Sequence, residues 1–152
     1  MSIMGIINLT PDSFFDGGKW ISQDMIYEKI KKWEKAGIDY IDVGCESSRP
    51  GCQKITQNEE ISRLERILDV IGEFPQIQFS IDTYKPQVAK LALSNGFSII
   101  NDIYAGGTNG IMYEFAKSFN AKIIIMHMKG DPKNMQINPF YDDVIDEINT
   151  YF

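Results

Sequence analysis

The sequence predicts an α/β fold in which about five βα units share a parallel sheet. Short runs rich in Ile and Val alternate along the chain with amphipathic stretches that have helical spacing. The apolar runs show little alternation between apolar and polar residues, as strands buried on both faces do. The 152 residues are enough for one domain, and no linker or change of composition divides residues 1–152.

Five apolar runs are the expected strands, and they lie at residues 3–7, 38–43, 77–81, 97–100 and 121–126. Between them, Thr56 and Glu59 form a capping box at the start of one helix, and Pro86 suits the first turn of another. Gly37 and Gly96 are expected to end helices. Apolar stripes at three- and four-residue spacing mark the five helices: Ile26, Ile30, Trp33; Ile61, Leu64, Leu68, Ile71; Val88, Leu91, Ala92; Ile111, Phe115, Phe119; and Tyr141, Val144, Ile148.

The composition is that of a soluble globular protein, with 43% hydrophobic and 24% charged residues. A formal net charge of −6 disfavours nucleic acid and anionic membranes as partners, since both select basic surfaces. No run is long enough for a membrane span and no signal peptide is evident, so a cytoplasmic location is expected. Cys45 and Cys52 are expected to be free thiols.

Each expected strand delivers a polar residue at its carboxyl end. These residues are Asn8, Asp42, Asp82, Asn101 with Asp102, and His127. Burying such groups without partners costs several kcal/mol, so five of them at one edge indicate a shared polar cavity. In parallel α/β folds the ligand site lies at this edge. A single one of these residues could equally be a helix cap or a turn former.

Two architectures remain open on these observations. One is an open doubly wound sheet, which the chain length favours, and the other is a partial (β/α)8 barrel, which typically needs about 250 residues. No Walker motif, G-x-G-x-x-G motif or nucleophile elbow is present. The residues by themselves indicate a small polar or anionic ligand and do not define a reaction.

Six ordered segments closely resemble the motifs of dihydropteroate synthases. They are residues 4–18 (MGIINLTPDSFFDGG), 41–51 (IDVGCESSRPG), 80–86 (SIDTYKP), 100–103 (INDI), 126–130 (MHMKG) and 134–144. The resemblance implies a (β/α)8 TIM-barrel fold, represented here by about five βα units of an incomplete barrel. It also implies a transferase of folate biosynthesis that condenses 4-aminobenzoate with 6-hydroxymethyl-7,8-dihydropterin pyrophosphate, giving dihydropteroate and pyrophosphate. Mg²⁺ is the implied cofactor and accompanies the pyrophosphate.

The resemblance assigns roles to residues that match the family's motifs. The implied pterin-binding residues are Asp42, Asp82, Asn101 and Met126. The implied pyrophosphate-binding residues are Asn8, Ser48 and Arg49, with Asn8 also beside the metal. The implied contacts of 4-aminobenzoate are Phe14, Ser48 and Pro50. Asp16 and Arg49 are the implied catalytic residues. His127 is expected to be structural, held by a hydrogen bond at the end of its strand.

The chain departs from the family pattern in two ways. Cys45 stands where the family usually has glycine, which would be strained if the position required a positive φ. The family's later motifs are also absent, so we expect a domain truncated before the C-terminal strands, with unpaired edges and little or no activity of the chain alone. The family implies a homo-oligomer, usually a dimer. The alternatives are the pterin-binding domain of a methyltetrahydrofolate corrinoid methyltransferase and a non-catalytic half-barrel.

Overall fold

The computed structural model describes residues 1–10, 22–47, 53–107 and 109–152. Strands and helices alternate through this part of the chain. The strands are β1 (Met4–Asn8), β2 (Tyr40–Gly44), β3 (Gln78–Asp82), β4 (Ile99–Asp102) and β5 (Lys122–Ile125). The helices are α1 (Gln23–Lys35), α2 (Gln57–Ile71), α3 (Pro86–Ser94), α4 (Ile111–Ser118) and α5 (Val144–Tyr151). The predicted order of five βα units is confirmed.

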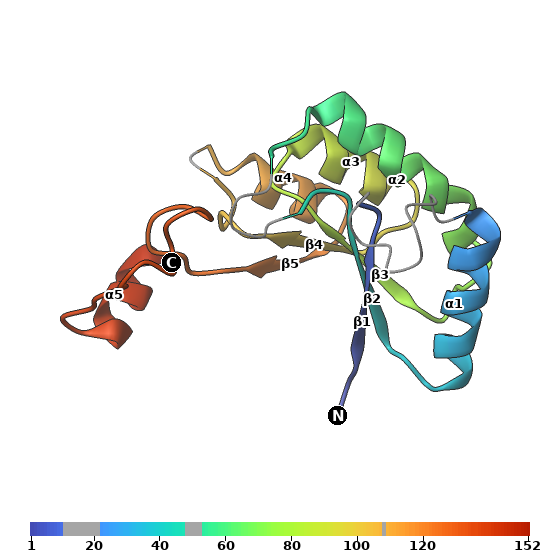
Figure 1. Ribbon diagram of the computed structural model, residues 1–152, viewed down its shortest axis with the longest axis horizontal. Helices are drawn as coiled ribbons and strands as arrows, with labels where there is room; N and C mark the ends of the chain where they lie inside the picture. Colours follow the sequence, from blue (N-terminus) through green and yellow to red (C-terminus); the bar gives the residue numbers. More distant parts are fainter. Residues whose placement is uncertain (11–21, 48–52, 108) are drawn as a thin grey trace.

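The strand order distinguishes between the two architectures that the residues had left open. Neighbours in the sheet follow chain order, β1-β2-β3-β4-β5, and every pair is parallel. Figure 1 shows α1 to α4 together over one face of a curved sheet. Right-handed crossovers between sequential strands produce this one-sided arrangement, whereas a doubly wound sheet reverses its order and carries helices on both faces. The sheet is therefore of the barrel type, and the chain-length argument for an open doubly wound sheet is wrong.

Local sequence signals set the helix ends. The Thr56 hydroxyl accepts a hydrogen bond from the Glu59 backbone N–H at 3.2 Å, as the capping box predicts for the start of α2. Pro86 is the first residue of α3. Gly37 and Gly96, just beyond α1 and α3, have φ of 80° and 97°, a left-handed conformation that glycine adopts without steric cost.

The core lies between the sheet and the layer formed by α1 to α4. Side chains from β1 to β4 and from α1 to α4 are fully buried there: Ile7, Ile41, Val43, Ile81, Ile100, Ile26, Ile30, Leu64, Ile67, Val88 and Met112. Burial of this apolar area is the main stabilising contribution to the fold, and it holds the carboxyl ends of the strands in register.

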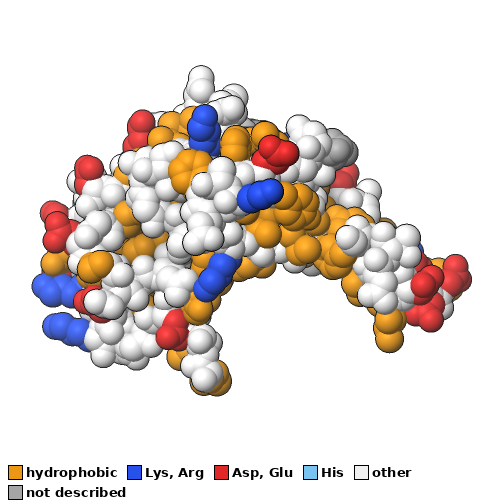
Figure 2. Space-filling model, turned by 180° about the vertical axis from the view of Figure 1, so that it is seen from behind, with side chains coloured by type: hydrophobic (Ala, Val, Ile, Leu, Met, Phe, Trp, Pro, Cys, Tyr) orange, Lys and Arg blue, Asp and Glu red, His pale blue; other side chains and the backbone are white. Residues whose placement is uncertain are grey.

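The opposite face of the sheet is less well covered than the sequence predicts. Met4 and Ile6 on β1 are 37% and 59% exposed, and Ile124 on β5 is 39% exposed. Figure 2 shows hydrophobic side chains along the hollowed side of the molecule. Burial on both faces is thus wrong for β1 and β5. Among the described strands each lies at an edge of the sheet with a neighbour on one side only, as expected.

The last helix begins later than its stripe predicts. Tyr141 lies outside α5, because the Asp143 carboxylate accepts hydrogen bonds from the backbone of Ile145 at 2.9 Å and Asp146 at 3.1 Å and so caps the helix at that point. α5 has no buried residue and lies apart from α1 to α4 (Figure 1). None of the helices in the described segments combines the length and apolar character that a membrane span requires.

Candidate functional site

Strand register brings four of the predicted residues to one edge and one face of the sheet. Asn8, Gly44, Asp82 and Asn101 pair in a continuous row across β1 to β4. Alternate residues of a strand point to the same face. Asp42 therefore shares this face one row deeper, where it pairs with Ser80. This is the face that α1 to α4 leave uncovered (Figure 1).

Asp42 and Asn101 are joined directly. The Asn101 Nδ2 donates to Asp42 Oδ2 at 3.0 Å, linking β2 to β4 across β3. Asp42 is only 7% exposed, and its second oxygen, Oδ1, is buried and meets no hydrogen-bond criterion with any described residue. The Ser80 hydroxyl is buried close to Asp42, and it too lacks a hydrogen bond of good geometry within the described segments. Buried polar atoms in native proteins are almost always paired, so these two atoms mark a place where a ligand would complete the hydrogen bonding.

Gly44 provides open space in the middle of the row. A Cβ atom built at this position would lie 3.0 Å from Asn8 Oδ1 and 3.5 Å from Asp82 Oδ2. The side chains of Asn8 and Asp82 therefore flank the same point from the two neighbouring strands. Because glycine leaves that point empty, a ligand could reach the backbone between an amide and a carboxylate.

The carboxylates at this edge are electrostatically coupled. Burial, as the largest cause, and then the negative charges of Asp42, Glu60, Asp102 and Glu46 together raise the pKa of Asp82 to about 7. Burial also raises the pKa of Asp42, which the nearby side chains of Ser80 and Asn101 oppose. Such a cluster favours a ligand that donates hydrogen bonds or carries positive charge.

Asp102 takes a different role from its neighbour Asn101. Asp102 pairs with Ile125. Because it follows Asn101 directly on β4, its side chain points to the opposite, helix-covered face of the sheet. Its carboxylate accepts hydrogen bonds from the backbone of Tyr104 at 2.9 Å and Gly106 at 2.8 Å. It is a turn former that shapes the β4–α4 connection, which is the alternative role considered for these strand-end residues.

The fifth strand contributes less than the pattern predicted. Met126 directly follows β5 and is half-buried. His127 packs its ring against Tyr151 at 4.8 Å and Tyr141 at 5.8 Å between centroids. The expected hydrogen bond of His127 is not found among the described residues, where aromatic contacts hold the ring instead.

Other predicted residues lie outside the part of the chain that the structure describes. They are Phe14, Asp16, Ser48, Arg49, Pro50 and Cys52. Cys45 is described, and it is a free, buried thiol, as expected. Its φ is not positive, so the strain anticipated for a residue replacing glycine at this position does not arise.

A buried polar network beside the site was not predicted from the sequence. Glu60 on α2 and Lys85 in the β3–α3 turn form an ion pair, and neither was singled out. A signal was available, because Glu60 occupies the same helical stripe as Leu64, Ile67 and Ile71, at spacings of four, three and four. A charged residue on an otherwise apolar stripe indicates a buried polar contact.

The described residues offer little for a metal held by protein ligands alone. They contain no group of three or more His, Cys, Asp or Glu side chains arranged to hold an ion. Asn8 presents an amide oxygen beside Gly44, and Asp82 presents a carboxylate oxygen there. One or two oxygen ligands fit Mg²⁺ that is bound mainly through substrate phosphates and water.

Comparison with known proteins gives one consistent result. The profile of the family described as "Pterin binding enzyme" matches residues 4–152. Dihydropteroate synthase from Streptococcus pyogenes serotype M1 is 43% identical over 126 residues, which cover 83% of this chain and 47% of that protein. The Escherichia coli K12 enzyme is 40% identical over 150 residues, covering 99% of this chain and 53% of that protein.

Solved structures agree with this result. The Yersinia pestis dihydropteroate synthase, in a complex with a sulfonamide drug, superposes with a TM-score of 0.82 at 38% identity, over 99% of this chain and 55% of that one. A clostridial dihydropteroate synthase crystallised in the presence of pteroic acid gives a TM-score of 0.83 at 35% identity. The chain thus spans about half the length of these two relatives.

Proposed function

Because the chain belongs to the family of pterin-binding enzymes, we propose that it provides the pterin site of a dihydropteroate synthase. The reaction joins 4-aminobenzoate to 6-hydroxymethyl-7,8-dihydropterin pyrophosphate and releases dihydropteroate and pyrophosphate. The observation that supports this most strongly is the Asp42–Asn101 pair on the open face of the sheet, with a buried carboxylate oxygen that no described residue binds.

The acceptor groups at this edge suit the ring of a pterin. The ring carries N–H donors on its pyrimidine edge and a carbonyl beside them. Asp42 Oδ1 is the free acceptor in the deeper row, Asp82 lies next to it in the upper row, and the Asn101 amide both donates and accepts. We infer that Asp42, Asp82 and Asn101 hold the ring, and that Met126 contributes an apolar contact.

The opposite end of the substrate carries two phosphates, and we assign it to the first two loops. Asn8 lies at the end of β1 beside Gly44, where a phosphate oxygen can approach the backbone. Ser48 and Arg49 offer a hydroxyl and a bidentate guanidinium, the groups that bind phosphate oxygens best. Mg²⁺, when bound with the diphosphate through Asn8, would neutralise its charge and make it a better leaving group.

The chemistry follows from the charges that develop when the bond between the methylene carbon and the phosphate oxygen breaks. The electron pair of that bond leaves with the pyrophosphate, and the pterin becomes cationic. The carboxyl groups of Asp42, Asp82 and Asp16 are suited to stabilise the cation, while Arg49 and Asn8 stabilise the leaving anion. Phe14, Ser48 and Pro50 would hold 4-aminobenzoate so that its amine attacks the methylene carbon and then loses a proton.

Calorimetry combined with a synthase assay tests this proposal. We expect the chain to bind 6-hydroxymethyl-7,8-dihydropterin pyrophosphate and expect Asp42→Asn to weaken binding by roughly 10- to 100-fold, since hydrogen bonds to charged groups contribute about 1.5–3 kcal/mol. Asp69→Asn, an exposed carboxylate on α2, is the matched control. Absence of binding by the unchanged chain would refute the pterin site, and binding without turnover would refute synthase activity of this chain alone.

Assembly and location complete the proposal. The open face of the sheet, and the edges of β1 and β5 that no other described strand covers, favour association with a further polypeptide surface. We propose a homo-oligomer, in the simplest case a dimer. Light scattering after gel filtration tests this, and a monomer at micromolar concentration would refute it.

We further propose a cytoplasmic location, which cell fractionation tests.

A further inference from the structure

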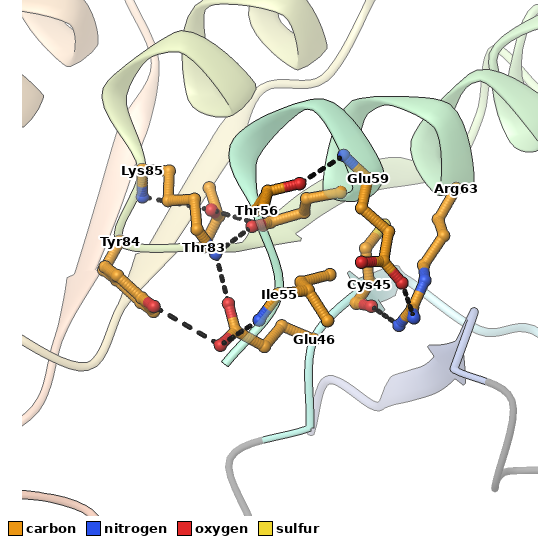
Figure 3. A network of polar contacts seen from close by, with 10 residues as sticks. Cys45, Glu46, Ile55, Thr56, Glu59, Arg63, Thr83, Tyr84 and Lys85 are labelled. Carbon is orange, nitrogen blue, oxygen red and sulfur yellow. Dashed lines mark hydrogen bonds and ion pairs between the residues drawn. The ribbon is translucent and has the colours of Figure 1, made fainter. Parts of the chain in front are cut away.

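A buried ionic network lies behind the proposed pterin site, between α2 and the β3–α3 turn. Figure 3 shows Lys85, Thr83 and Glu46 converging there. The Lys85 ammonium donates hydrogen bonds to the carboxylates of Glu60 and Glu46. The Glu60 side chain is 1% exposed, and those of Glu46 and Lys85 are 12% and 13% exposed. None of these three residues has a role in the proposed binding of the pterin.

Burying three charges is costly, and the contacts indicate how that cost is offset. Burial alone would lower the pKa of Lys85, but the hydrogen bonds and negative charges of Glu46 and Glu60 outweigh burial and raise it. Lys85 is therefore charged, and its ammonium is bonded to both carboxylates. Even so, a buried ion pair is seldom a net source of stability compared with apolar residues of the same size. The network calls for an explanation in terms of geometry rather than stability.

The geometry leads to Asp82 through its neighbour Thr83. The Thr83 hydroxyl donates to Glu60 Oε1 at 2.6 Å and accepts from the Lys85 backbone N–H at 3.1 Å. The Thr83 backbone N–H donates to the Asn101 carbonyl oxygen at 3.0 Å. The Thr83 side chain is thus fixed by the ionic network, and its backbone is fixed by β4. Asp82, the residue before Thr83, lies next to this fixed point.

Asp82 depends on this arrangement because its own carboxylate is not tied. In the described segments of the chain, no hydrogen bond reaches either of its oxygens, whereas Asp42 is held by Asn101. The backbone at the end of β3 sets where the Asp82 side chain leaves the strand. That backbone pairs with Gly44 and Asn101 in the sheet, and on its carboxyl side it is held by Thr83 and the groups that bind Thr83.

We propose that Glu60 and Lys85 are positioning residues: through Thr83, their buried ion pair holds the Asp82 carboxylate toward the pterin. This inference deepens the proposed function and rests on it for the identity of the ligand. We expect the network to affect binding of the pterin ring, because Thr83 follows Asp82 in the chain and bonds to the Asn101 carbonyl oxygen. The pyrophosphate end, assigned to Asn8 and the first two loops, does not depend on Thr83.

The test compares Lys85→Met, Lys85→Arg and Glu60→Gln with the unchanged chain. We expect Lys85→Met and Glu60→Gln to weaken the affinity for 6-hydroxymethylpterin by at least about 10-fold, the usual effect of losing a supporting contact behind a binding group. Affinity for inorganic pyrophosphate is expected to stay within about twofold, as for independent sites. Lys85→Arg keeps the cation and is expected to restore most of the pterin affinity. Hydrogen exchange at the Thr83 amide should accelerate in Lys85→Met and Glu60→Gln.

Val70→Ala controls for loss of folding stability, because Val70 is buried on the same helix as Glu60 and its apolar side chain forms no hydrogen bond or ion pair. The inference is overturned if pterin affinity falls in Val70→Ala as far as in Lys85→Met at equal stability. It is equally overturned if faster exchange at Thr83 leaves pterin affinity unchanged. Failure of the unchanged chain to bind pterin would instead refute the proposed function. In that case, hydrogen exchange at the Thr83 amide of the unliganded chain would still show whether Glu60 and Lys85 hold Thr83 in place.

Discussion

Replacing Asp82 with asparagine should stabilise the chain at alkaline pH while weakening its affinity for pterin. Burial and the charges of Asp42, Glu60, Asp102 and Glu46 raise the pKa of Asp82 from 3.8 to about 7. A carboxyl group with a raised pKa binds its proton more tightly in the folded than in the unfolded chain. Its contribution to stability is therefore present at low pH and is lost as the pH rises through 7.

The size of the effect follows from the pKa difference. A rise of about three pH units corresponds to roughly 4 kcal/mol of cost for ionising Asp82 in the folded chain, at about 1.36 kcal/mol per unit. Structural relaxation and water reduce this, so we expect Asp82→Asn to raise the free energy of unfolding at pH 8 by roughly 2–4 kcal/mol. Near pH 4.5, where both side chains are neutral in the folded chain, the difference should shrink markedly.

Urea unfolding followed by circular dichroism at pH 4.5, 6, 7 and 8 measures this difference, and Asp69→Asn serves as the exposed control. A constant difference between Asp82→Asn and the unchanged chain at all four pH values would refute the electrostatic reasoning. In parallel, pterin affinity at pH 8 should fall by roughly 10- to 100-fold, the effect of losing a charged acceptor. A stabilised variant with unchanged affinity would show that Asp82 does not contact the ligand.

Three further predictions concern single contacts. Gly44→Ala places a Cβ 3.0 Å from Asn8 Oδ1. It should weaken pyrophosphate binding by about 10-fold or more, since small displacements at a reacting centre are costly. An unchanged affinity for pyrophosphate in calorimetry would contradict this prediction. Leu64→Ala, at a fully buried position, should lower the free energy of unfolding measured in urea titrations by about 2–5 kcal/mol. Leu68→Ala, at a partly buried position on the same helix, is the control and should lower it less. Thr56→Ala should cost about 1 kcal/mol by removing the cap of α2, whereas Thr56→Ser, which keeps the hydroxyl, should cost a few tenths; equal losses would refute the capping role.

Much of the fold follows from local signals that do not depend on distant contacts. The caps at Thr56 and Pro86 and the glycine stops at Gly37 and Gly96 set helix ends through bonds within a few residues. The Ile- and Val-rich runs predicted the five strands to within two residues at each end. The start of the last helix was misplaced, because the capping bonds of Asp143 outweighed a short apolar stripe.

The candidate site was predictable only in part. The polar strand ends indicated its position, and Asp42, Asp82, Asn101 and Asn8 do share one face. The register between neighbouring strands decided which of these polar side chains reach the open face of the sheet. Asn101 and Asp102 are adjacent and equally polar, yet alternation along β4 sends the first to the open face and the second into a turn.

By itself the sequence determined the element types, their order and the polar character of one sheet edge, because propensity, capping and hydrophobic spacing act over short stretches of chain. Only the tertiary structure decided the sequential strand order, the bond between Asp42 and Asn101, and the burial of Glu60 and Lys85. These depend on which residues lie opposite one another across strands and helices up to 59 positions apart. Pairing over such distances is set by packing of the whole core and not by any local pattern.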